Sequence, residues 1–120
     1  MRKLKIMEHI SLDGVIQHSA DDNNFPYSDW TAPYRTPAGR EEILAAYGKS
    51  FDLLLGRRTY DLWSGFWPKV PSSPMADGIN AATKYVATHH PKVLHGARSR
   101  ALDRTSWRAF APSRRRTART

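Results

Sequence analysis

The sequence predicts an α/β protein organised around a mostly parallel β-sheet. Two observations lead to this prediction: short apolar segments recur along the chain, and segments rich in helix-forming residues lie between them. The resulting order is strand, helix, strand, helix, strand, and strands that are joined through helices run parallel in one sheet. With 120 residues, the chain has the length of one small domain.

The first predicted strand covers residues 3–10. Leucine and isoleucine alternate there with lysine and histidine, a pattern that is typical of a strand with one buried face. The Ser-Leu-Asp-Gly sequence at residues 11–14 then predicts a turn. Residues 17–38 are polar and contain three prolines, so we expect a long loop, a feature that is usually functional or mobile in a compact domain.

The first helix is predicted over residues 40–49. Glu41 and Glu42 lie in its first turn, where acids favour the helix dipole, and Gly48 lies near its end. Residues 51–55 are almost continuously apolar, which suits a buried parallel strand.

A second helix is expected to open at Thr59, whose hydroxyl would cap the helix N-terminus. Three prolines between residues 68 and 74 predict a second loop, and residues 75–82 have weak helical character. Residues 84–88 read Lys-Tyr-Val-Ala-Thr and predict the third strand.

The charge of the chain is concentrated in its C-terminal part. Residues 92–120 hold nine Lys and Arg against one acid, Asp103, whereas residues 1–91 hold ten Lys and Arg against ten acids. The formal net charge of +8 therefore belongs to residues 92–120 alone. The high isoelectric point thus says nothing about nucleic-acid binding by residues 1–91.

Composition excludes several other classes of protein. The chain has no cysteine, so it forms neither a disulfide framework nor a thiolate metal site. The adjacent His89 and His90 point apart and have no acidic partner nearby in the sequence, so we expect no metal site. The N-terminus lacks the pattern of a signal peptide, and no apolar run approaches the roughly 20 residues that span a bilayer. We therefore expect a soluble, cytoplasmic protein that does not bind a membrane.

The junction around Gly56 is the strongest local signal. A predicted buried strand ends there, the glycine allows the backbone to approach a ligand, and a helix follows whose free N–H groups favour an anion. Arg57 and Arg58 could bind phosphate oxygens with paired donors, as at a nucleotide site at the carboxyl end of a parallel sheet. The alternative is a tight strand-to-helix turn with two solvated arginines.

Three segments of the chain, taken together, resemble one known family. Residues 11–16, with the sequence SLDGVI, resemble the SLDG-x-I signature of dihydrofolate-reductase-like proteins, which include the RibD C-terminal reductase domain. Residues 52–60 resemble the second motif of that family, and residues 84–88 resemble its third segment. Further matching positions are Trp63, Trp67, Pro68 and Asn80. The resemblance covers residues 1–91 and implies a dihydrofolate-reductase-like three-layer sandwich, of which this chain would hold the N-terminal part.

The resemblance also implies a cofactor, NADPH, and a reductase activity. The residues that would bind the cofactor are Gly14, Gly56, Arg57, Arg58, Thr59 and Thr88, with an arginine on the 2′-phosphate. The resemblance implies a small-molecule substrate. In the best-known members of the family it is a ribosylamino-pyrimidine of riboflavin biosynthesis that is reduced at its ribose carbon, as in 5-amino-6-(5-phosphoribosylamino)uracil reductases, and many relatives have no assigned substrate.

Three residues would face the substrate. Asp13 is the candidate catalytic residue, because it could orient a ribose hydroxyl or relay a proton, although it could equally form only the turn with Gly14. Ser11 and Trp30 are the candidate substrate-binding residues. The alternative for Trp30 is an aromatic side chain that is simply packed within its loop.

The resemblance ends near residue 91. The family continues with a Gly-Gly phosphate turn and further strands, but this chain contains no Gly-Gly pair, and residues 92–120 have eight arginines and no periodic apolar pattern. We interpret residues 92–120 as a basic tail that arose by a frameshift and does not fold, and we predict weak or absent NADPH binding. The exposed strand edge left behind could pair with another chain, for example in a homodimer.

A non-enzymatic function is the alternative. Residues 114–119, with four arginines, could bind phosphate backbones without sequence specificity, and this binding would weaken as salt rises. We expect no specific nucleic-acid partner.

Overall fold

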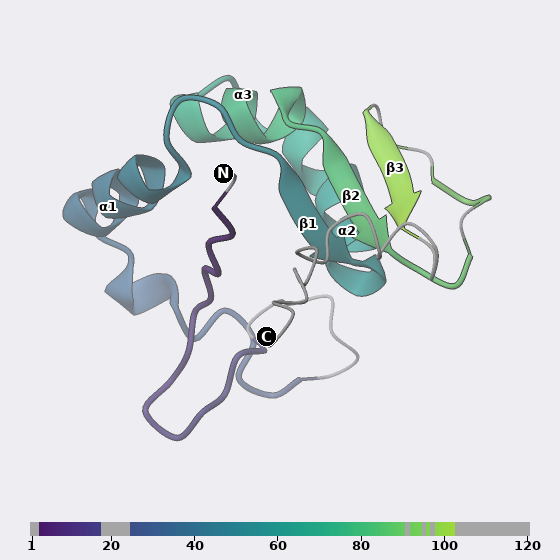
Figure 1. Cartoon of the computed structure of the whole chain (residues 1–120). Helices are drawn as coiled ribbons and strands as arrows, with labels where there is room; N and C mark the ends of the chain where they lie inside the picture. Colours follow the sequence, from purple (N-terminus) through teal and green to yellow (C-terminus); the bar gives the residue numbers. More distant parts are fainter. Residues whose placement is uncertain (1–2, 18–24, 91, 95, 97, 103–120) are drawn as a thin grey trace, which may run out of the picture. The chain divides into compact units, whose positions relative to one another are not determined.

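The computed structural model describes residues 3–17, 25–90, 92–94, 96 and 98–102 (Figure 1). The chain divides into two compact units, one up to Ala45 and the other from Ala46 onward. The division therefore falls within the part of the chain that the family resemblance treats as continuous. The predicted division between residues 1–91 and residues 92–120 is based on a proposed frameshift in the sequence, and it stays a prediction.

The predicted strand at residues 3–10 is wrong, because these residues form neither strand nor helix. The alternating pattern requires one face to be covered, yet Leu4, Ile6 and Ile10 are 75%, 90% and 65% exposed. A strand also forms only when another strand pairs with it, and the described sheet contains three other segments.

The rest of the first unit is short and turn-rich. Residues 26–31 are turns, and a single turn of 3₁₀-helix, η1 (Ala32–Tyr34), follows them. The helix α1 (Pro37–Tyr47) begins three residues earlier than predicted. The Oγ1 of Thr36 accepts a hydrogen bond from the N–H of Gly39 across 3.1 Å, which caps the first turn and lets Pro37 occupy the first helical position.

The second unit contains a fully parallel three-stranded sheet. Its strands are β1 (Leu53–Gly56), β2 (Lys84–Ala87) and β3 (Ser99–Leu102), in the spatial order β1-β2-β3 (Figure 1). Leu53 pairs with Lys84 and Gly56 with Ala87, while Lys84 pairs on its other side with Ser99. The α/β class and the parallel sheet are therefore confirmed.

The strand β3 corrects one expectation. It lies within residues 92–120, where the sequence showed no apolar pattern and we predicted no folded element. Its residues Ser-Arg-Ala-Leu have little strand propensity of their own. The strand therefore forms mainly because it pairs with β2. Residues 103–120 lie outside the described residues.

Two helices connect β1 to β2. The first, α2 (Arg57–Phe66), starts directly after β1 with Gly56 at the N-cap position and no capping side chain. Thr59 therefore lies inside the first turn, and its predicted role as the cap is wrong. After the short η2 (Trp67–Lys69), the helix α3 (Pro74–Ala81) is capped by Ser73, whose hydroxyl accepts from the N–H of Ala76.

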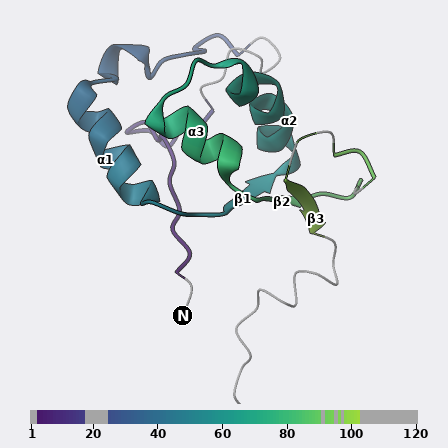
Figure 2. The ribbon, with the colours of Figure 1, turned by 90° about the horizontal axis from the view of Figure 1, so that it is seen from above.

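The core of the second unit lies between one face of the sheet and these helices. Leu53 and Leu55 of β1 and Val86 of β2 are buried on that face. They pack with Tyr60 of α2 and Ile79 of α3, so α2 and α3 cover the same side of the sheet, as Figure 2 shows. This packing fixes the start of α2 at the carboxyl end of the strands.

Candidate phosphate site at the carboxyl edge of the sheet

The carboxyl ends of β1 and β2 meet at one edge of the sheet. Gly56 ends β1 and Ala87 ends β2, and these two residues are register partners. The residues that follow them, Arg57 and Thr88, therefore leave the sheet side by side. The two segments that the sequence analysis assigned to phosphate binding are brought together here.

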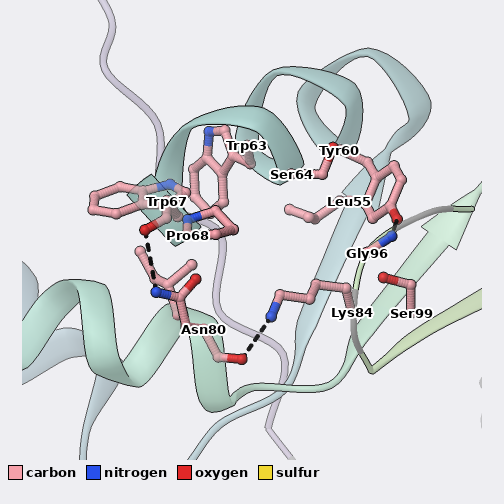
Figure 3. A pocket seen from close by; sticks show the side chains of 11 residues that line it. Leu55, Tyr60, Trp63, Ser64, Trp67, Pro68, Asn80, Lys84, Gly96 and Ser99 are labelled. Atoms are coloured by element: carbon pink, nitrogen blue, oxygen red, sulfur yellow. Dashed lines mark hydrogen bonds between the residues drawn. The ribbon is translucent and has the colours of Figure 1, made fainter. Parts of the chain in front are cut away.

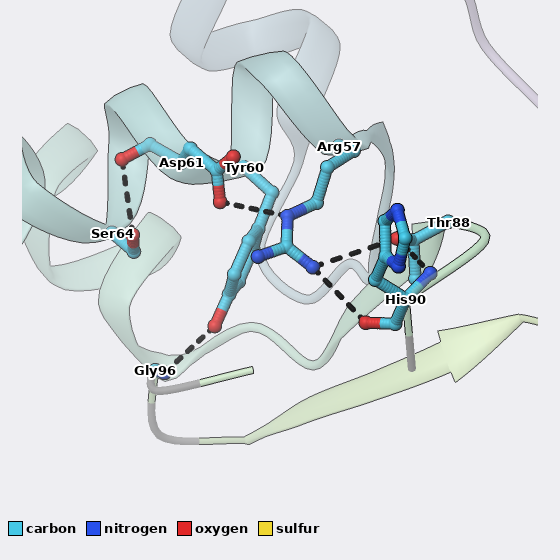
Figure 4. Close-up of polar contacts among 7 residues, drawn as sticks. All are labelled: Arg57, Tyr60, Asp61, Ser64, Thr88, His90 and Gly96. Atoms are coloured by element: carbon cyan, nitrogen blue, oxygen red, sulfur yellow. Dashed lines mark hydrogen bonds and ion pairs between the residues drawn. The ribbon is translucent and has the colours of Figure 1, made fainter. Parts of the chain in front are cut away.

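The Arg57 side chain bridges these two segments (Figure 4). Its Nη1 donates to the Oγ1 of Thr88 across 3.5 Å and to the backbone carbonyl of His90 across 3.2 Å. The Thr88 Oγ1 also accepts from the His90 N–H across 3.0 Å, which holds the loop after β2 in place. Because its Nη2 takes part in none of these contacts, the guanidinium retains donors for an anion.

An acidic side chain balances this arginine. The Nε of Arg57 donates to the Oδ1 of Asp61 across 2.9 Å, one helical turn further along α2. The carboxylate is about half exposed, so the pair contributes little to stability, but it orients the guanidinium. Asp61 and the His90 carbonyl were not expected at this site, although the i, i+4 spacing of Arg57 and Asp61 on a helix is a signal for such a pair.

The N-terminus of α2 suits an anion. Within the described residues the helix has no acidic residue in its first turn, and Gly56 at its N-cap position supplies no capping side chain. Arg58 and Thr59 are exposed on this turn. Gly56 has an extended backbone, φ −70°, and a Cβ built there meets no atom within 4 Å. Neither backbone conformation nor space within the described residues therefore requires glycine at this position.

The predicted catalytic residue lies in a turn of the first unit. The N–H of Gly14 donates to the carbonyl of Ser11 across 3.0 Å, and Gly14 has a φ of +88°, which favours glycine. The hydroxyl of Ser11 donates to the carboxylate of Asp13 and accepts from the N–H of Val15. The predicted turn at residues 11–14 is therefore confirmed.

The hydrogen bond from Ser11 lowers the pKa of Asp13, with a smaller contribution from its own backbone N–H. The carboxyl is thus ionised at neutral pH, which makes it a hydrogen-bond acceptor rather than a proton donor. Of the two chemical roles expected for Asp13, orienting a hydroxyl fits this environment better than relaying a proton.

Trp30 is held within the first unit. Its indole Nε1 donates to the carbonyl of Gln17 across 2.9 Å, and the ring is half-buried. This contact is what a packed loop side chain requires. The candidate residues thus fall in two groups, Ser11, Asp13, Gly14 and Trp30 in the first unit and Gly56, Arg57, Arg58, Thr59 and Thr88 in the second.

A metal centre and a membrane-spanning helix are two other features that bear on function in the described part of the chain. No group of three or more His, Asp or Glu side chains there is arranged to hold a metal ion. None of the described helices combines the length and apolar character of a membrane span. The arginines at 114–119, on which the nucleic-acid alternative depends, lie outside the described residues.

Comparisons with known proteins do not identify a family. No protein-family model matches the chain, and no curated protein matches it. The resemblance to dihydrofolate-reductase-like proteins therefore stays an expectation from the three sequence segments.

Proposed function

We propose that the chain is an NADPH-dependent reductase of the dihydrofolate-reductase-like group, of the RibD C-terminal type. The observation that carries this proposal is the 3.5 Å contact between Arg57 and Thr88 at the carboxyl edge of the sheet. Two of the three family-like segments meet at this contact, although 31 residues separate them in the sequence. A strand, a glycine and a helix N-terminus beside an arginine form a site that suits phosphate.

In this proposal the second unit binds the phosphate groups of NADPH. The N–H groups at the start of α2 and the guanidinium of Arg57 donate to phosphate oxygens, and Arg58 and Thr59 supply further polar groups on the same turn. Arg57 suits the 2′-phosphate, because its planar guanidinium can donate two bonds at once. The nicotinamide would supply the hydride, while the protein orients it and excludes water.

The proposed substrate is a small sugar-bearing pyrimidine, the substrate class of the family that the chain resembles. The ionised carboxylate of Asp13 would accept a hydrogen bond from a ribose hydroxyl and so fix the carbon that is reduced. We expect NADPH to bind weakly, because the chain contains no Gly-Gly pair to form the second phosphate turn of that family.

Titration with NADPH, with tryptophan fluorescence as the signal, tests the proposal. We expect saturable quenching above the micromolar range, weaker quenching by NADH, and loss of the NADPH preference in Arg57→Met. Arg40→Met is the matched control, because Arg40 is an exposed arginine of α1 outside the site.

Near-UV circular dichroism of each variant shows whether it keeps a packed fold. Equal binding of NADPH and NADH, or unchanged binding in a folded Arg57→Met variant, would overturn the proposal. An absence of NADPH binding by the folded chain at millimolar concentration would overturn it as well.

A further inference from the structure

A pocket of about 290 Å³ lies between α2, α3 and the sheet (Figure 3). Its floor includes Lys84 and Ser99, the first residues of β2 and β3. Small-molecule sites begin at about this volume, near 300 Å³. The pocket is therefore large enough for a compact ligand, and its described lining includes none of the residues of the proposed phosphate site.

The walls of the pocket are mainly aromatic and aliphatic. Trp63 and Trp67 line one side, with their ring centroids 5.8 Å apart and their planes at 74°. Leu55, Tyr60 and Ile79 complete the apolar lining toward the core. Such walls favour the flat ring of an aromatic ligand, because edge and face contacts between aromatic groups add to the burial of apolar area.

Polar groups converge on the floor of this apolar pocket. Lys84 and Ser99 are register partners on adjacent parallel strands, so their side chains lie on one face of the sheet with a strand spacing of about 4.8 Å. The Oγ of Ser99 is buried and has no hydrogen-bond partner within the described residues. A buried hydroxyl of this kind is costly unless something bonds to it.

Lys84 keeps donors for a ligand. Its Nζ donates to the Asn80 carbonyl across 3.0 Å, which leaves two of the three N–H groups of the ammonium. Arg98 donates to the neighbouring Ala81 carbonyl across 3.3 Å, so two cations converge on the C-terminal end of α3. Burial, and secondarily the positive charge of Arg98, lower the pKa of Lys84. An anion beside these groups would offset the repulsion between them.

We propose that this pocket binds a small aromatic carboxylate, with its ring against the wall that Trp63 and Trp67 form and its carboxylate on the Lys84 ammonium and the Ser99 hydroxyl. The carboxylate would accept one bond from each donor and neutralise the cation, while the ring would fill the apolar space. A neutral aromatic molecule would leave the cation unbalanced. A carboxylate without a ring would leave the apolar walls without a partner.

Calorimetric titration with benzoate, benzyl alcohol and acetate tests this proposal on the full chain. We expect saturable binding of benzoate, at least about tenfold weaker binding of each comparison compound, and a shift of the Trp67 indole N–H signal in NMR spectra with benzoate alone. Equal binding of benzoate and benzyl alcohol would overturn the proposal, as would no binding at all by the folded chain.

Two variants test the residues. Lys84→Met keeps the length of the side chain without its charge, and we expect it to weaken benzoate binding at least about tenfold. Lys49→Met is the matched control, because Lys49 is exposed and outside the pocket. Ser99→Ala keeps the charge and should weaken binding by a smaller factor, and unchanged binding in both folded pocket variants would contradict the assignment.

The outcome is independent of the NADPH proposal. Benzoate should bind equally well to Arg57→Met, because Arg57 is not among the residues that line the pocket. Loss of benzoate binding in that folded variant would show that the ligand occupies the phosphate site instead.

Discussion

The phenolic oxygen of Tyr60 accepts a hydrogen bond from the backbone N–H of Gly96 across 2.7 Å. Tyr60 is a buried residue of α2, and Gly96 belongs to the segment that leads from β2 into β3. The bond therefore ties that segment to the helix layer over the sheet. Its position explains why β3 can pair with β2 although its own sequence is a weak strand former.

Gly96→Ala should destabilise the second unit. A Cβ at this position would lie 2.7 Å from the Tyr60 oxygen and 3.1 Å from the Ser99 Oγ, so the segment would have to move. We expect a loss of about 1–3 kcal/mol in the free energy of unfolding, measured with urea. Gly65→Ala, within α2, is the control. A Cβ at this position meets no atom within 4 Å, so the substitution should raise the free energy of unfolding by roughly 0.5–1 kcal/mol. Equal effects at both positions would contradict the close approach at Gly96.

Tyr60→Phe should remove the acceptor and leave the Gly96 N–H without its partner. The expected loss is about 1–2 kcal/mol in the free energy of unfolding, because the ring and its packing are retained. Tyr34→Phe, at an exposed residue of η1, should change stability by less than about 0.5 kcal/mol. A Tyr60→Phe variant as stable as the parent would show that the hydrogen bond is not maintained in solution.

Asp61→Asn should strengthen the binding of phosphate-bearing ligands. The Asp61 carboxylate neutralises Arg57, and its removal would leave more positive potential at the start of α2. We expect roughly threefold to tenfold tighter binding of NADPH at low salt, and a stability cost below about 0.5 kcal/mol. Asp77→Asn in α3 serves as the charge control. Weaker binding in Asp61→Asn would contradict this prediction and show that the orientation of the guanidinium by Asp61 matters more for binding than the gain in positive potential.

Lys84 should make stability rise with pH in the alkaline range. Its folded-state pKa is lowered, so above this value the folded chain has released a proton that the unfolded chain still holds. Because the unfolded state then binds more protons, the free energy of unfolding increases with pH up to the unfolded pKa near 10.4. The increase should be absent in Lys84→Met, and urea titrations between about pH 8 and 10 measure it.

The raised pKa of Tyr47 has the opposite consequence at the upper end of this range. Burial keeps its phenol neutral in the folded state, so its contribution to stability is lost as pH rises beyond the ordinary tyrosine pKa. The comparison between parent and Lys84→Met at each pH cancels this effect. Identical pH profiles for the two proteins would contradict the buried position of Lys84.

The middle of the chain follows its sequence pattern, whereas the two flanking segments do not. The segments at β1 and β2 form paired strands as predicted, although only Leu53 and Leu55 of β1 are buried and Leu54 is 40% exposed. Arg57 and Thr88 meet because each directly follows one of these paired strands. Residues 3–10 have the better strand pattern but form no strand, while Ser99–Leu102 has a poor pattern and forms one. Strand formation depends on an available partner edge, and a local pattern does not contain that information.

The contacts between side chains were likewise only partly predictable from the sequence. The i, i+4 pair of Arg57 and Asp61 could be read from the helix period. The bond between Tyr60 and Gly96 joins residues 36 positions apart, and no local rule pairs them. The convergence of Lys84 and Ser99 likewise depends on the register of β3, an element that the sequence did not indicate.

The order of the strands has a consequence for synthesis on the ribosome. In the described sheet, β1, β2 and β3 are neighbours in the same order in which they are translated. No strand has to insert between two that have already paired, so each new strand can add to the last edge as it emerges. The β1-β2 pair with its covering helices could therefore assemble before β3 leaves the exit tunnel, and until then the edge of β2 that β3 later occupies would have no partner strand.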